Sequence, residues 1–156
     1  MLLSAQAIRR LGEDGLITPY DPAMVQPCSY DLKLGRNFLI KDRPAADKDR
    51  LFIMPESFCL AETIEILRVP LTMVATIHGK SSWGRKGLLV HVTAGLVDPG
   101  WDGRLTLELK NVSSVPLVLR TGEPIAQVVW QLLDEATDTP YRGRYQYAKG
   151  VEASKP

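Results

Sequence analysis

Cysteine and histidine are scarce in this chain of 156 residues. It has only two cysteines and two histidines, and the cysteines, Cys28 and Cys59, lie far apart in the sequence. Two cysteines build no disulfide framework, although these two could in principle pair, and the content fits the reducing cytosol, where we expect the protein to work. The stretch 1–10 is too short and too polar for a secretory signal peptide. No apolar run approaches membrane-spanning length, so no membrane partner is expected.

An excess of one charge is also lacking. The chain carries 19 Lys and Arg against 18 Asp and Glu, which gives a formal net charge of +1. This balance lacks the basic footprint of nucleic-acid-binding proteins, so we expect no nucleic-acid partner. The hydrophobic fraction of 45% is enough for a globular core, and the length fits one domain.

Short apolar stretches separated by glycine and proline dominate the sequence. Strands are predicted over 30–34, 51–60, 73–77, 88–94, 105–109, 116–119 and 125–132. A short helix is predicted from Ser4, a good N-cap, to about Gly12. Many short strands with such turns are typical of a sandwich or barrel, so we expect a mainly β domain over 1–134. Beyond it, 135–156 is polar and is expected to form a tail.

A basic turn with glycine and serine occupies residues 79–87, GKSSWGRKG. Its glycines allow the backbone to approach a ligand, and successive amides around Ser81 and Ser82 can form an anion-binding nest. Lys80 and Arg85 add positive charge, and the Arg85 guanidinium offers a planar fork of donors. Taken alone, the segment is better explained as a surface hairpin turn with two solvated bases, since these are ordinary turn residues. It lacks the spacing of a P-loop.

The stretch 104–110, RLTLELK, alternates leucines with polar residues. Period two predicts a strand with one buried face, so Thr106 and Glu108 project together from the other face. A solvated polar face would explain them. The nearly uncharged segment 88–95 precedes them, however, and if it covers this face Glu108 can act as a proton shuttle.

The tetrapeptide DPGW at 98–101 predicts a type II turn. Pro99 restricts φ and Gly100 permits a positive φ. Asp98 is placed either to cap the turn or to bind a ligand hydroxyl, and Trp101 is more typical of core packing than of a stacking platform.

Together these motifs carry a resemblance to the dCTP deaminase branch of the dUTPase-like superfamily. The family patterns G-[RK]-S-S-x-x-R-x-G, V-H-x-T-A, [IV]-D-P-G-[WF]-x-G and L-E match residues 79–87, 90–94, 97–103 and 107–108. The stretch 25–35, VQPCSYDLKLG, is similar to V-Q-P-x-S-x-D-x-x-L-G, and 141–150 is similar to the family's nucleotide-closing tail. The resemblance implies a distorted jelly roll of the dUTPase-like, β-clip type, assembled as a homotrimer with sites shared between subunits.

The resemblance implies hydrolytic deamination of dCTP to dUTP and ammonia without zinc. Glu108 would be the general acid/base that activates water for attack on C4 of cytosine. Ser81, Arg85 and the Ala94 carbonyl would position that water. Zinc-type deaminases need H-x-E and P-C-x-x-C motifs, and neither occurs in this chain.

The resemblance also implies a set of substrate-binding residues. Thr106 would lie beside the base, Asp98 would take the 3′-hydroxyl, and Trp101 would help to exclude a ribose. The triphosphate would be held by Lys80, Ser81, Ser82, Tyr141 and Arg144, with Mg²⁺ bound through its oxygens and not by protein side chains.

The chain departs from the family pattern in the tail. The family often has Lys where Arg144 stands and Gln near Ala148, and Tyr147 and Lys149 also differ. These differences concern closure of the tail over the nucleotide and leave Glu108 untouched.

Alternatives remain for the reaction. Some family members also remove pyrophosphate and release dUMP, and Gly95 and Gln127 resemble that bifunctional type. A plain dUTPase has Tyr at the position of Trp101 and lacks the set Ser81, Arg85 and Glu108. A non-catalytic nucleotide-binding relative would have no need of that set.

Overall fold

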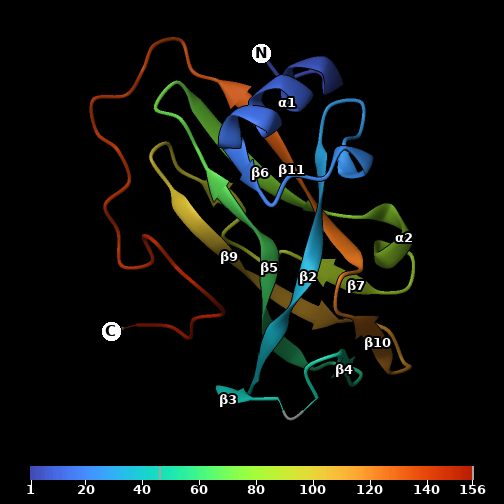
Figure 1. Cartoon of the computed structure of the whole chain (residues 1–156). Coiled ribbons are helices and arrows are strands. Elements are labelled where there is room, and N and C mark those ends of the chain that lie inside the picture. The colour runs from blue at the N-terminus through green and yellow to red at the C-terminus, as the bar shows by residue number, and fades with distance from the viewer. Residues whose placement is uncertain (46, 156) are drawn as a thin grey trace.

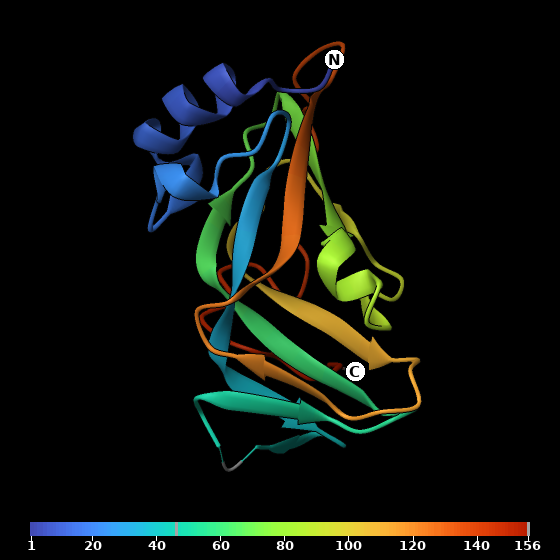
Figure 2. The ribbon, with the colours of Figure 1, turned by 90° about the vertical axis from the view of Figure 1, so that its right-hand side faces the viewer.

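The protein is a mainly β domain in which one curled sheet encloses an apolar core (Figure 1 and Figure 2). The computed structural model describes residues 1–45 and 47–155, so Pro156, the last residue of the predicted tail, lies outside it. The helical elements are α1 (Ala5–Leu11), η1 (Gly12–Leu16), η2 (Pro22–Met24) and α2 (Ser81–Gly84). The strands are β1 (Ile17–Thr18), β2 (Tyr30–Ile40), β3 (Arg43–Pro44), β4 (Arg50–Ile53), β5 (Phe58–Arg68), β6 (Met73–Gly79), β7 (Leu88–Val90), β8 (Leu96–Val97), β9 (Asp102–Asn111), β10 (Leu117–Arg120) and β11 (Pro124–Leu132).

The main sheet has the strand order β7-β9-β5-β2-β11-β6-β8, and every pairing is antiparallel. β1 pairs with β5, β3 pairs with β2, and β4 and β10 form a separate two-stranded sheet. The largest fully buried side chains are Trp130, Tyr30 and Phe38, from β11 and β2. Among the helices that the structure describes, none is long and apolar enough to cross a membrane.

β9 has the alternation that its sequence predicts. Leu105, Leu107 and Leu109 are buried, while Thr106 and Glu108 are partly exposed on the opposite face. The predicted helix is also confirmed: the Ser4 side chain caps α1 by accepting from the Ala7 amide at 3.4 Å.

Several predicted strands are longer in the structure, such as 30–34, which continues to Ile40 as β2, and two others are divided or cut short. The predicted strand 51–60 is divided, because Pro55 lacks an amide hydrogen and Glu56 has φ of +59°, so the chain turns between β4 and β5. The predicted strand 88–94 ends at Val90, and the Thr93 amide donates to the Glu108 carboxylate at 3.0 Å instead of to a neighbouring strand. The basic turn at 79–87 contains the helical turn α2, which the sequence analysis did not predict.

β2 bulges away from β5, and two buried glutamates occupy the break in the ladder. The register shifts between Leu34 and Phe38 of β2. The Glu62 Oε1 atom accepts from the backbone amides of both residues 36 and 37 at 3.3 Å, and the Glu65 Oε2 atom accepts from the amide of residue 33 at 2.9 Å. A Cβ atom on Gly35 would lie 2.3 Å from the Glu62 Cγ atom, so the bulge requires glycine there. Glu62 thus replaces backbone hydrogen bonds that the bulge removes, and Glu65 adds a contact to β2 just before the bulge.

Glu65 is fully buried, and this burial raises its pKa from 4.5 to about 7. The amide and the ammonium of Lys33 oppose the shift only in part. Between these two pH values the folded chain holds a proton that the unfolded chain releases. The free energy of unfolding therefore falls as pH rises through this window.

We predict that Glu65→Gln removes this contribution. The variant should gain stability relative to the wild type as pH rises from about 4.5 to about 7, by at most ~1.4 kcal/mol per pH unit. Urea unfolding at a series of pH values measures the difference. Glu56→Gln, at an exposed glutamate that pairs with Lys110, serves as the control for the loss of a surface carboxylate. A pH-independent difference for Glu65→Gln would contradict the assignment.

Candidate active site

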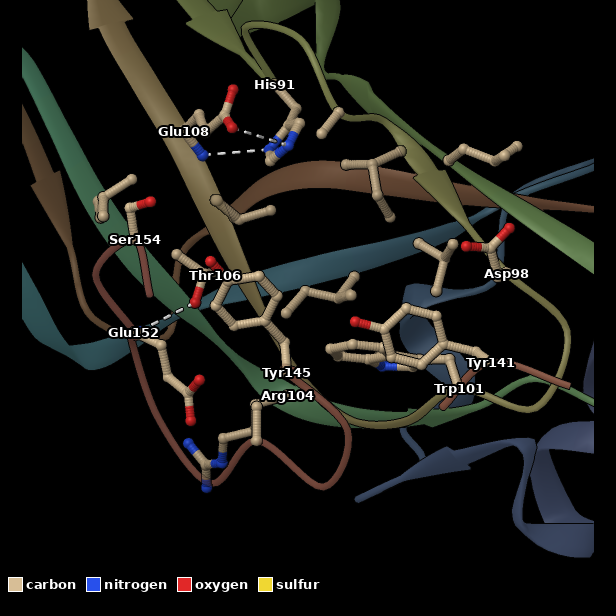
Figure 3. A pocket seen from close by; sticks show the side chains of 18 of the residues that line it. His91, Asp98, Trp101, Arg104, Thr106, Glu108, Tyr141, Tyr145, Glu152 and Ser154 are labelled. Carbon is tan, nitrogen blue, oxygen red and sulfur yellow. Dashed lines mark hydrogen bonds and ion pairs between the residues drawn. The ribbon is translucent and has the colours of Figure 1, made fainter. Parts of the chain in front are cut away.

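A cavity of about 500 Å³ lies between β8, β9 and the C-terminal tail. Figure 3 shows Glu108 and His91 at one end and Asp98, Trp101 and Tyr141 at the other, with Thr106 between them. Of the residues predicted for the site, the cavity brings together Glu108, Ala94, Asp98, Trp101, Thr106 and Tyr141.

The Glu108 carboxylate is held by the loop that follows β7. Its Oε2 atom accepts from both the amide and the hydroxyl of Thr93, each at 3.0 Å. The side chain is 25% exposed and lines the cavity, so one oxygen is held in place while the group still meets the cavity. This arrangement suits a positioned general acid/base.

His91 is a site residue that the sequence analysis missed. Its Nδ1 atom accepts from the Glu108 amide at 3.1 Å, and its Nε2 atom lies 3.8 Å from the Glu108 Oε1 atom. Burial lowers the pKa of His91, while the Glu108 charge and the Ala94 carbonyl oppose the shift. The ring is therefore a neutral imidazole with its proton on Nε2, beside the carboxylate. The signal was present in the V-H-x-T-A motif at 90–94, from which the sequence analysis assigned no role to the histidine.

An aromatic pair forms the opposite end of the cavity. Trp101 is 9% exposed, its indole nitrogen donates to the Gly103 carbonyl at 3.2 Å, and its ring centroid lies 5.4 Å from that of Tyr141. Gly100 has φ of +88°, as the predicted turn requires. Asp98 is exposed beside this pair, where its carboxylate can accept from a ligand hydroxyl.

The C-terminal tail runs along the edge of β9 and covers part of the cavity. The Ala148 carbonyl accepts from the Arg104 amide at 2.8 Å, and the Glu152 amide donates to the Thr106 hydroxyl at 3.1 Å. A Cβ atom on Gly103 would lie 2.8 Å from the Ala148 amide nitrogen. The tail thus docks at Ala148 through its backbone, despite the departure from the family pattern there.

The charge of the cavity is predominantly negative. Arg104 is the only Lys or Arg among the described residues that line it, and its guanidinium lies 3.4 Å from the buried Glu62 Oε1 atom. The carboxylates that line the cavity belong to Asp42, Asp98, Glu108 and Glu152. This cavity does not by itself offer the cations that a polyanion needs.

The other predicted site residues do not line the cavity. Ser81, Ser82 and Arg85 are exposed on α2, which lies on the right of the molecule in Figure 1, whereas the tail descends on the left. Lys80 pairs with Asp31, and Gln127 donates to the Gly79 carbonyl at 3.2 Å. Arg144 is exposed and donates to the backbone of residue 155 at 2.8 Å.

Known proteins are similar to this chain over most of its length. A family model described as dCTP deaminase-like matches residues 2–133. The chain is 36% identical to a protein of Sulfurihydrogenibium sp. named dCTP deaminase, dUMP-forming, over 99% of this chain and 97% of that relative. A protein of Streptomyces griseus with the same name is 38% identical over 99% of this chain and 95% of the relative.

Solved structures show the same fold. The 2′-deoxycytidine 5′-triphosphate deaminase from Agrobacterium tumefaciens superposes with a TM-score of 0.74 at 23% identity, over 84% of this chain and 47% of that one, so this chain spans about half its length. The EIAV dUTPase superposes with a TM-score of 0.57 at 18% identity, over 83% and 93% of the two chains. The predicted dUTPase-like fold is thereby confirmed. With the match of the family model and these identities, the chain belongs to the dCTP deaminase family.

Proposed function

We propose that the chain deaminates dCTP by hydrolysis, with Glu108 as the general acid/base. The observation that carries the proposal is the Glu108 carboxylate, which Thr93 holds at one end of a nucleotide-sized cavity. Glu108 takes a proton from water as the C4–O bond forms and passes it to N3 of the base. It then takes the hydroxyl proton of the tetrahedral adduct and delivers it to the amino nitrogen, so that the C4 carbonyl forms as the C4–N bond breaks and ammonia leaves. The names of the relatives support this substrate.

The rest of the cavity orients the nucleoside. The Ala94 carbonyl can accept a hydrogen bond from the attacking water, and Thr106 lies on the same face of β9 as Glu108. Asp98 accepts from the 3′-hydroxyl, and the pair of Trp101 and Tyr141 closes the sugar end against a ribose 2′-hydroxyl.

The triphosphate is bound by a second copy of the chain. The cavity is lined by more carboxylates than cations, and the exposed residues Ser81, Ser82 and Arg85 lie away from it. A homotrimer in which α2 of one subunit meets the cavity of the next would supply these groups, and Arg85 would then stabilise the charge that develops during water attack. Tyr141 and Arg144 of the tail would complete the phosphate contacts.

Mg²⁺ would be bound through the triphosphate oxygens. Among residues 1–45 and 47–155, no three His, Cys, Asp or Glu side chains gather as a ligand set. Mg²⁺ prefers phosphate oxygens and retained waters, and it would neutralise the phosphate charge. The free cysteines, Cys28 and Cys59, fit a cytosolic location for this activity.

The product is dUMP. Both relatives named above are dUMP-forming, and Gly95, next to Ala94, presents no side chain to obstruct a second water near the phosphates. After deamination, water attacks the α-phosphorus of dUTP and pyrophosphate leaves. Gln127, which also occurs in plain dUTPases, is compatible with this second step.

The first prediction concerns the products. Incubation with dCTP and Mg²⁺, followed by anion-exchange separation, should yield dUMP, pyrophosphate and ammonia. Accumulation of dUTP would show that the enzyme catalyses only the deamination step. Survival of dCTP with hydrolysis of added dUTP would indicate a dUTPase, and binding without turnover of either would indicate a non-catalytic relative.

The second prediction concerns Glu108. Glu108→Gln keeps the shape of the side chain but removes the proton shuttle, so kcat for deamination should fall at least ~100-fold. Calorimetry should show that dCTP binding is largely kept. Glu135→Gln, at an exposed glutamate in the tail, is the control and should behave as the wild type. Near-normal turnover by Glu108→Gln would exclude the proposed mechanism.

The third prediction tests the shared site. Glu108→Gln and Arg85→Ala should each be nearly inactive, but co-expressed they should recover about a quarter of wild-type activity, because that share of randomly mixed interfaces joins an intact Glu108 to an intact Arg85. Co-expression of Glu108→Gln with Asp98→Ala is the control, since both changes lie in one cavity and no mixed site is intact. Equal recovery in the two mixtures, or none in the first, would count against the shared site.

A further inference from the structure

The junction between β6 and α2 is held by side chains from two other strands. The Gln127 amide nitrogen on β11 donates to the Gly79 carbonyl at 3.2 Å, and its Oε1 atom accepts from the Ser29 hydroxyl at 3.0 Å. A Cβ atom on Gly79 would lie 2.9 Å from the Val90 carbonyl oxygen, so the backbone is closely packed on its other side. The residue that directly precedes Lys80 is therefore restrained on both sides.

Asp31 of β2 holds the next residue. Its side chain is only 6% exposed, and its Oδ2 atom forms a direct ion pair with the Lys80 ammonium and accepts from the Gln26 amide at 3.2 Å. Asp31 is the register partner of Gln127 across β2 and β11, so the two side chains lie on the same face of the sheet. The Asp31 Oδ1 atom is buried without a hydrogen-bond partner among the described residues.

Lys80 is also the residue from which α2 begins. Its carbonyl accepts from the Trp83 amide at 3.0 Å and from the Gly84 amide at 2.9 Å. Its side chain makes no capping hydrogen bond to α2 and points instead to Asp31. The position of Lys80 therefore sets the position of Ser81 and, one turn later, of Arg85.

We propose that Asp31 is a positioning residue that orients α2 through Lys80. This inference rests on the proposed function, in which α2 serves the cavity of a neighbouring subunit. Removal of the Lys80 ammonium would leave the buried Asp31 carboxylate without a counter-charge, and an unpaired buried charge is strongly unfavourable. The exposed groups of α2, Ser81, Ser82 and Arg85, remain free for the ligand.

The test compares Asp31→Asn, Lys80→Met and the double variant. Asparagine keeps the shape of Asp31 without its charge, and methionine keeps the apolar stem of Lys80. Asp49→Asn removes an exposed, ion-paired carboxylate and serves as the matched control. We would measure kcat and KM for dCTP, together with the melting temperature of each variant.

Each single variant should lower kcat by about tenfold to a hundredfold with little change in KM, because small misplacements of catalytic groups have effects of this size. The double variant should be no slower than the slower single variant, since both changes break one interaction. Lys80→Arg should keep most of the activity. If Lys80→Met raises KM without lowering kcat, or if the two losses multiply, the inference is wrong. Should Asp31→Asn not fold, the contrast of Lys80→Met with Lys80→Arg in kcat and KM gives the answer.

Amide hydrogen exchange tests the same contact without catalysis. Exchange at residues 83–85 should be faster in Asp31→Asn and Lys80→Met, and unchanged in Asp49→Asn. If the wild type fails to turn over dCTP, the proposed function is wrong. This measurement still tests whether the Asp31–Lys80 pair positions α2. Unchanged exchange in both variants would overturn the positioning role.

Discussion

The domain depends on the buried carboxylates of Glu62 and Glu65, which hold β5 to β2 where the backbone ladder is broken. Glu62 accepts hydrogen bonds from the amides of residues 36 and 37 in the β2 bulge, and Glu65 accepts from the amide of residue 33, just before the bulge. Glu62 also pairs with Arg104, so the same carboxylate that closes the sheet orients a cation at the cavity wall. β9, which carries Glu108, pairs with β5 along most of its length. The candidate site therefore depends on the contacts by which Glu62 and Glu65 hold β5 to β2.

The residues that line the candidate active site and the exposed residues at α2 lie in different parts of the fold. Glu108, Thr106 and the aromatic pair line one cavity that has an excess of carboxylates, whereas Ser81, Ser82 and Arg85 lie on α2, outside that cavity. Such a division suits a substrate with an uncharged base at one end and a highly charged triphosphate at the other. It also explains why an assembly of several copies is proposed: a single copy does not place Glu108 and the exposed Arg85 guanidinium together.

Regular local structure could be predicted from the sequence because it depends on the conformational preferences of the residues in the segment itself. The alternation of β9, the Ser4 cap and the positive φ of Gly100 are examples. The errors lie where a distant group competes with the local pattern. The segment 88–94 has strand-forming residues throughout, yet it leaves the sheet after Val90 because the Glu108 carboxylate takes the Thr93 amide. The far half of β5 was missed because it carries Glu62 and Glu65, whose burial is stable only with partners on β2.

The sequence by itself determined the strand-rich domain, the family and the identity of the candidate general acid/base, because these follow from periodicity and from an ungapped series of motifs. Only the tertiary structure decided that His91 is a neutral partner of Glu108, that Lys80 is bound by Asp31, and that α2 lies apart from the cavity. These features join residues far apart in the chain or depend on the burial of a side chain. Neither the distance between two such residues nor the loss of water around them is encoded in a local pattern.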